Sequence, residues 1–213
     1  MEERKLTETE SIEVITSMIA RTKRQFVRGE GNMLLFWGYL CVIVALLQYL
    51  LGYLYYGLQV SLPVPPKAIW WLIPIVGIPY TLLFRKRKAG SRNVKTYTDQ
   101  LTITLWTYVI WLNLATIVIG ALFFISGLNV WYVMMLFAFF VVGMAVSVQG
   151  MIIKENVMIA GGAFSVVCGG FLVAGMITGA SWLMMFTQPL LIISMIIMMI
   201  IPGHILNRKA RNQ

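Results

Sequence analysis

The orientation of the whole chain is set by one basic stretch, Arg85-Lys86-Arg87-Lys88-Ala89-Gly90-Ser91-Arg92-Asn93-Val94-Lys95. It lies between two long apolar regions and carries six cations in eleven residues. A single charge at the centre of a bilayer costs about 2.5–3.5 kcal/mol or more, so this stretch must lie in water or among lipid headgroups. The apolar regions can then be placed relative to it.

The composition of the 213-residue chain is that of a membrane protein. Apolar residues make up 59% of the sequence and charged residues only 12%, whereas soluble domains average about 25% charged residues. The bilayer core is about 30 Å thick and takes about 20 apolar residues per helix, and the chain supplies several runs of that length. The sequence therefore predicts an all-α integral membrane protein.

Six apolar runs predict six transmembrane helices arranged as three hairpins. Aromatic residues mark one membrane interface where neighbouring runs meet, at Tyr53, at Trp70-Trp71, at Trp131-Tyr132 and at Trp182. The expected transmembrane domain covers residues 34–206, with spans at about 34–58, 68–84, 101–125, 131–149, 157–179 and 183–206, and residues 207–213 form a basic tail.

Residues 1–33 are the only sizeable polar segment, and they predict a cytoplasmic amphipathic helix and linker. Thr7 followed by Glu10 forms a capping-box pattern. The helix is expected to end at residues 29–32, and it carries an apolar stripe at helical spacing: Ile12, Ile15, Ile19 and Phe26. Two interpretations are open. The helix lies on the inner membrane surface with its basic half among anionic headgroups, or it docks a cytoplasmic partner or a neighbouring subunit.

The distribution of charge predicts the topology. With the basic stretch in the cytoplasm, both termini are cytoplasmic, and sixteen of the seventeen Lys and Arg residues, all except Lys67, fall on that side. Topology and anionic lipid explain these cations better than nucleic acid does, because no basic groove with interleaved aromatic residues is present. The cations expected to contact lipid headgroups or a protein partner are Arg21, Lys23, Arg24, Arg28, Arg85, Lys86, Arg87 and Lys88.

The predicted spans contain no Asp, Glu, Lys or Arg, the residues on which proton relays and intramembrane hydrolysis depend. The single histidine, His204, has no second ligand at metal spacing, and the two cysteines, Cys41 and Cys168, each lie inside an apolar run. We therefore expect no catalytic, cofactor-binding or metal-binding residues, and no enzymatic activity.

Neutral polar, small and proline residues remain inside the spans, and they serve either helix packing or a narrow path for a neutral solute. Prolines in the short second span predict a kink, which marks a substrate site in some transporters and a packing feature in most membrane helices. The fifth span is expected to be a central packing helix or a subunit contact, and the sixth to face lipid or pack loosely. The residues concerned are Gln48, Pro74, Pro79, Asn113, Gly161, Ser165, Gly169 and Gln188.

Three short stretches resemble a family of small six-span bacterial inner-membrane proteins whose activity is uncharacterised. They are Glu10-Ser11-Ile12-Glu13-Val14-Ile15-Thr16-Ser17-Met18-Ile19, Phe36-Trp37-Gly38-Tyr39 and Leu72-Ile73-Pro74-Ile75-Val76-Gly77. The resemblance implies a bacterial cytoplasmic (inner) membrane location and supplies no functional residues.

Two functions follow from the positions of the polar residues. The first is a non-enzymatic accessory or regulatory module that acts through its cytoplasmic basic face on anionic lipid, on a cytoplasmic protein or on other copies of itself. The alternative is a small transporter or channel for a neutral or lipophilic solute. An enzyme that acts on lipid has no residues in its favour.

Overall fold

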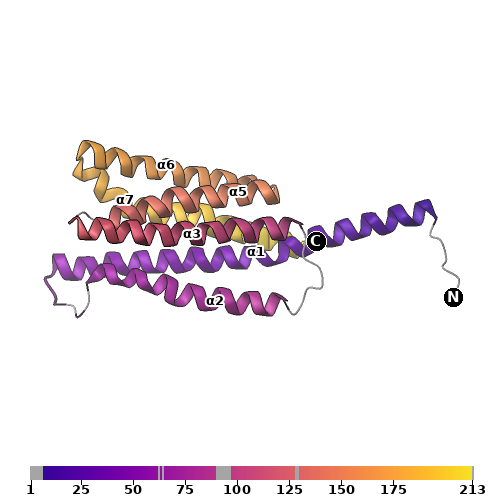
Figure 1. Cartoon of the computed structure of the whole chain (residues 1–213), viewed down its shortest axis with the longest axis horizontal. Helices are drawn as coiled ribbons and strands as arrows, with labels where there is room; N and C mark the ends of the chain where they lie inside the picture. The colour runs from indigo at the N-terminus through magenta and orange to yellow at the C-terminus, as the bar shows by residue number, and fades with distance from the viewer. Residues whose placement is uncertain (1–6, 62, 64, 90–96, 128–129, 213) are drawn as a thin grey trace.

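The computed structural model describes residues 7–61, 63, 65–89, 97–127 and 130–212, and these are almost entirely helical (Figure 1). Six of the described helices are long and apolar enough to cross a membrane. This confirms the prediction of an all-α, multi-pass membrane protein. Residues 90–95 of the basic stretch lie outside the described residues. The six spans are Gly31–Gly57, Pro66–Phe84, Gln100–Phe123, Val130–Ile153, Asn156–Thr178 and Ser181–Arg211.

Three of the spans contain a π-helical turn, a rare element that occurs mostly as a single bulge in an α-helix. In chain order the elements are α1 (Glu8–Gly52) and π-helix η1 (Tyr53–Gly57); 3-10 helix η2 (Pro66–Trp71) and α2 (Leu72–Ala89); α3 (Tyr97–Ile125); α4 (Val130–Leu136), π-helix η3 (Phe137–Val142) and α5 (Gly143–Ile153); α6 (Asn156–Thr178); and α7 (Ser181–Met195), π-helix η4 (Ile196–Ile200) and α8 (Ile201–Arg211).

Helix α1 is one helix of 45 residues that includes both the N-terminal segment and the first span. Thr7 and Glu10 form the predicted capping box, in which the Glu10 carboxylate accepts a hydrogen bond from the Thr7 backbone N–H at 2.9 Å. The predicted end of the helix at residues 29–32 is wrong, because the backbone stays helical there. Gly31 serves close packing instead, since a Cβ on it would lie 2.8 Å from the Gly203 carbonyl oxygen of α8.

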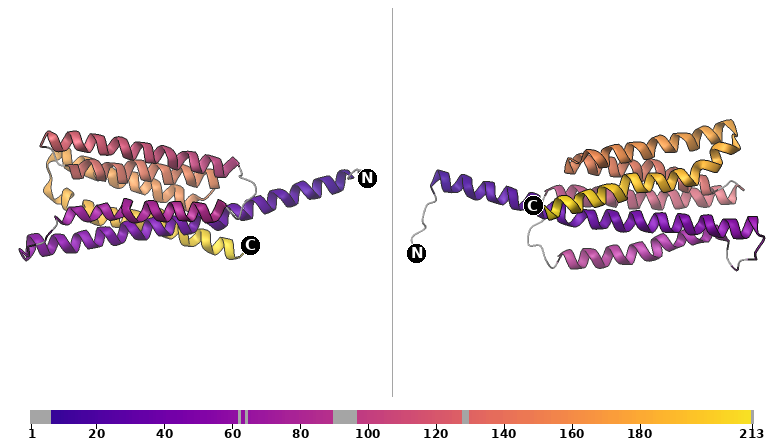
Figure 2. Two further views of the ribbon diagram at one scale, coloured as in Figure 1. Left: turned by 60° about the horizontal axis from the view of Figure 1, so that its bottom comes forward. Right: turned by 180° about the vertical axis from the view of Figure 1, so that it is seen from behind.

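The length of α1 carries its first part beyond the bundle. At 1.5 Å per residue the helix is about 67 Å long, more than twice the bilayer core of about 30 Å. Figures 1 and 2 show its N-terminal part extending past the ends of α2 and α8. The predicted linker between an N-terminal helix and the first span is therefore absent from α1, and the C-terminal tail predicted from residue 207 is also helical, as far as Arg211.

The sixth span forms the centre of the bundle, which corrects the prediction that it faces lipid or packs loosely. Met198 is fully buried, and Met195 and Met199 are each only 4% exposed. Glycines on the neighbouring helices make room for this span. A Cβ on Gly161 of α6 would lie 2.8 Å from the Met198 Cα, and a Cβ on Gly38 of α1 would lie 3.0 Å from the Met199 Cβ. Because the backbones approach closely at these glycines, the apolar sixth span is buried in the bundle and does not face lipid.

The second and third spans lie at the periphery. Only 6% and 11% of their most apolar segments are buried in the protein. Two aromatic contacts help to hold the second span on α1. The Trp37 indole fills the space beside Gly77, and the Phe36 and Tyr80 rings stack with centroids 3.6 Å apart. Most of the α2 and α3 side chains are thus left facing the surroundings of the chain.

Candidate functional site

Among the described residues, the polar side chains that pair between helices lie in two kinds of place: inside the bundle, and at the end of the bundle where α8 finishes. We call the second place the basic end. Figures 1 and 2 place the end of α2, the C-terminus and the projecting part of α1 at this end. Among the described residues, no group of three His, Cys, Asp or Glu side chains is placed to hold a metal ion.

Gln48 and Gln188 meet inside the bundle, and they form hydrogen bonds with protein groups. The Gln188 amide nitrogen donates to the Gln48 side-chain oxygen at 3.0 Å and to the Ala45 carbonyl at 2.9 Å. The Trp70 indole N–H donates to the same Gln48 oxygen at 2.8 Å. This network joins the first, second and sixth spans, so these amides hold helices together.

A second interhelical hydrogen bond joins the third and fourth spans, between residues that the sequence analysis did not select. The Trp106 indole N–H donates to the Gln149 side-chain oxygen at 3.0 Å. Both residues lie in the part of their span nearest the basic end. Their similar depth in the membrane is therefore the sequence feature that could have predicted their pairing. Which residue each one faces depends on the rotation of α3 and α5, and the sequence does not specify that rotation.

The predicted small-residue stripe of the fifth span is in contact with its neighbours. The Ser165 hydroxyl is buried and donates to the Phe139 carbonyl of η3 at 3.0 Å. A Cβ on Gly169 would lie 2.9 Å from the Phe139 Cβ, and one on Gly161 would lie 2.7 Å from the Ile197 carbonyl oxygen of η4. Along this stripe, helix α6 therefore packs closely against two π-helical turns, η3 and η4.

The other predicted packing or pathway residues lie apart from this centre. Pro74 is in the first turn of α2 and Pro79 is inside it, where its side chain is exposed. Asn113 is exposed on α3, and its amide has no hydrogen bond within the described chain. Two buried hydroxyls, those of Thr102 and Ser194, also lack a partner among the described residues.

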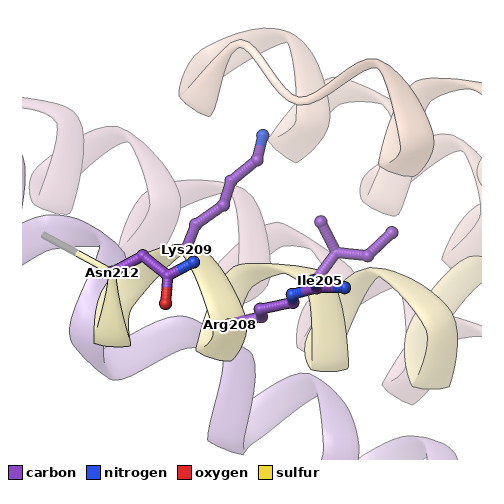
Figure 3. A pocket seen from close by; sticks show the side chains of 4 residues that line it. All are labelled: Ile205, Arg208, Lys209 and Asn212. Carbon is purple, nitrogen blue, oxygen red and sulfur yellow. The ribbon is translucent and has the colours of Figure 1, made fainter.

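The basic end contains a pocket of about 400 Å³ lined by one face of α8 (Figure 3). The lining residues are Ile205, Arg208, Lys209 and Asn212, which recur at intervals of three and four. The Lys209 ammonium bonds both carboxylate oxygens of Glu155 at 2.7 Å, and this pair fixes α8 to the start of α6. Arg208 is exposed and pairs with no carboxylate in the described part of the chain.

Two more polar pairs hold α1 against α8 next to this pocket. The Tyr39 hydroxyl and His204 Nε2 are 2.9 Å apart, and the Asn207 amide nitrogen donates to the Asn32 side-chain oxygen at 2.8 Å. His204 is thus placed by a tyrosine of the first span.

The basic residues predicted to contact lipid or a partner lie on two helices that reach this end. Arg21, Lys23, Arg24 and Arg28 belong to α1, and Arg85, Lys86, Arg87 and Lys88 belong to the last turns of α2. Their side chains lie outside the described part of the structure. The opposite end carries Lys67, whose ammonium lies 5.9 Å from the centre of the Trp131 ring.

Comparison with known proteins finds no relative of this chain. No protein-family model matches the chain, and no curated protein and no solved structure is significantly similar to it.

Proposed function

We propose that this chain is a non-enzymatic multi-pass protein of the bacterial inner membrane, an accessory or regulatory module that acts through its cytoplasmic face. In this proposal the six spans form three hairpins, both termini are cytoplasmic, and the basic end is the cytoplasmic end. The charge distribution supports this orientation, because sixteen of the seventeen Lys and Arg residues belong to that side.

The observation that carries the proposal is the continuous helix α1 with exposed apolar side chains beyond the bundle. Ile12 is 64% exposed and Met18 is 62% exposed. A helix that lies flat on the membrane needs a break where the span begins, and α1 is helical across that point. The projecting apolar face therefore favours a protein partner in the cytoplasm over the membrane surface.

The two interpretations of α1 differ in the surroundings of residue 18. A Met18→Cys variant, in a background without Cys41 and Cys168, is labelled with an environment-sensitive fluorophore and reconstituted in liposomes that contain anionic lipid. We expect a water-exposed label that lipid-borne quenchers do not reach. A control label at Ser17, on the other face of α1, should behave alike; quenching of position 18 alone would show that the helix lies on the membrane.

Partner capture is then tested in intact cells with a photo-cross-linker at position 12 of the full-length chain. A single defined adduct is expected, and Met18→Asp should abolish it, because a buried carboxylate without a partner is costly. Ser17→Asp is the matched control and should leave the adduct unchanged. Equal loss with both variants would contradict a specific apolar docking face.

Anionic lipid is the second partner in this proposal, and the pocket on α8 supports it. An apolar wall from Ile205, the cation of Arg208 and the amide of Asn212 suit an acyl chain joined to a phosphate. A juxtamembrane cation contributes about 1 kcal/mol to binding anionic lipid, so Arg208→Ala should retain about fivefold less of it during purification. Lys67→Ala, at the other end of the bundle, is the control; equal retention in both variants would argue against the pocket.

Transport of a neutral or lipophilic solute is the alternative. Its candidate residues include Gln48, Gln188 and Ser165, whose hydrogen bonds to neighbouring helices favour a structural role, and also Pro74, Pro79 and Asn113. Solute flux through purified protein in liposomes, reduced by Gln188→Leu, would support this alternative over the accessory module.

A further inference from the structure

Asn113 presents an unpaired amide close to the middle of the bilayer. The third span covers Gln100–Phe123, and Asn113 lies within two residues of its midpoint. Its side chain is exposed, and no described residue forms a hydrogen bond with it. Acyl chains have neither donors nor acceptors, and an unsatisfied amide in an apolar medium costs several kcal/mol. The nearby hydroxyl of Thr116, by contrast, is satisfied by the Leu112 carbonyl at 2.8 Å.

Isoleucines flank this amide at the spacing of a helix–helix seam. Ile103, Ile110 and Ile117 follow one another at intervals of seven residues, and Asn113 comes three residues after Ile110. The three isoleucines are 43%, 54% and 52% exposed. A seven-residue repeat of apolar side chains lines up along one side of a helix, as in the seams by which helices pack, and a single polar residue in such a seam fixes its register.

This seam lies beside the face of α3 that contacts its own bundle. Trp106 bonds Gln149 of α5, and a Cβ on Gly120 would lie 3.2 Å from Val130 of α4. Trp106 and Gly120 are each seven residues from Asn113, so Asn113 lies at the border of this face, and the line from Ile103 to Ile117 beside it stays exposed.

We propose that the seam Ile103, Ile110, Asn113 and Ile117 binds the same seam of a second copy of this chain, with reciprocal hydrogen bonds between the two Asn113 amides. Two copies inserted in one membrane share their orientation, so their α3 helices run parallel and place Asn113 at the same depth. An amide is both donor and acceptor, so it complements itself across a two-fold axis. A different membrane protein would need a polar group at that same depth.

Self-association is measured by single-molecule photobleaching of labelled, full-length protein in liposomes over a range of protein-to-lipid ratios. The Asn113→Leu variant should dissociate about tenfold to a few hundredfold more readily, as expected for the loss of two interhelical hydrogen bonds of about 0.6–1.7 kcal/mol each. Asn113→Gln, which keeps the amide, should retain most of the association. Adding Ala115→Asn to Asn113→Leu moves the amide to another face of α3 and should not restore it.

Disulfide cross-linking locates the seam independently of these energies. In a background without Cys41 and Cys168, cysteine at position 110 or 117 should form dimers on oxidation, and cysteine at exposed position 111 or 118 should not. A monomer at every protein density, equal association of wild type and Asn113→Leu, or cross-linking at 111 and 118 as efficient as at 110 and 117 would each overturn the proposal. Unchanged thermal unfolding of the variants shows that the bundle itself is intact.

Discussion

Alanine at Gly161 should destabilise the bundle, and alanine at Gly170 on the same helix should not. At position 161 the new Cβ would lie 2.7 Å from the Ile197 carbonyl oxygen and 2.8 Å from the Met198 Cα. These are backbone atoms of η4 and cannot rotate aside, so α6 and η4 must separate. At position 170 a Cβ meets nothing within 4 Å.

The magnitude follows from the comparison of the two variants. Alanine is favoured over glycine in a helix by about 0.8–1.0 kcal/mol, and both variants gain this term. Overpacking of a close contact costs about 1–3 kcal/mol and applies to Gly161→Ala alone. The free energy of unfolding should therefore differ between the variants by about 1–3 kcal/mol, with Gly170→Ala equal to or above wild type.

Equilibrium unfolding of purified protein in mixed micelles, followed by tryptophan fluorescence, measures this difference. Equal free energies of unfolding for the two variants would refute the close approach of α6 to η4. A stabilised Gly161→Ala would refute it as well, because helix propensity alone would then govern both positions.

Two further predictions concern polar groups. Gln48→Leu leaves the Trp70 indole N–H without its acceptor and removes one of the two acceptors of Gln188. It should therefore lower the free energy of unfolding by about 1–2 kcal/mol, more than Trp70→Phe does. Equal stability of Gln48→Leu and wild type would contradict the network. Hydrogen bonds from the Thr7 backbone N–H and hydroxyl hold the pKa of Glu10 below 4.5. Their contribution to the first turn of α1 is present above that pH and is lost as the pH falls through the lowered pKa, so amide exchange there should speed up in acid relative to a Glu10→Gln variant, whose side chain does not titrate.

The number and approximate position of the spans could be predicted from the sequence because a bilayer demands about 20 apolar residues per crossing. The predicted spans 34–58 and 157–179 lie close to the observed Gly31–Gly57 and Asn156–Thr178. Burial within the bundle could not be predicted in the same way. The sixth span, rich in Met and Ile, has the composition of a lipid-facing helix, and it becomes central only because glycines on other helices lie opposite it.

The continuity of α1 illustrates a second limit of the sequence. A Gly-Glu-Gly sequence at residues 29–31 is typical of a helix end, because each glycine costs about 1 kcal/mol relative to alanine in a helix. At Gly31 the absent side chain instead admits the Gly203 carbonyl of α8. A glycine that ends a helix and one that allows helices to cross look the same until the partner helix is placed.

The candidate residues divide in a similar way. Gln48, Gln188 and Ser165 were selected as polar groups inside apolar spans, which is a property of composition, and each has a partner. The Trp106–Gln149 pair was missed because its significance lies in which two side chains face each other. Pairing of this kind depends on helix rotation, which the pattern of apolar residues does not determine when a span is apolar on every side.

The unbroken helix α1 also has a mechanical consequence. A force applied to its projecting half is transmitted along a single rod into the bundle, where the same helix carries Gln48 and the ring contacts that hold α2. Tilting the outer part of this lever by a bound partner would therefore load both of its neighbours in the membrane. Gly29 lies two residues before the contact of Gly31 with α8, and glycine has weak helix propensity, so we expect the rod to bend most easily where it leaves the bundle.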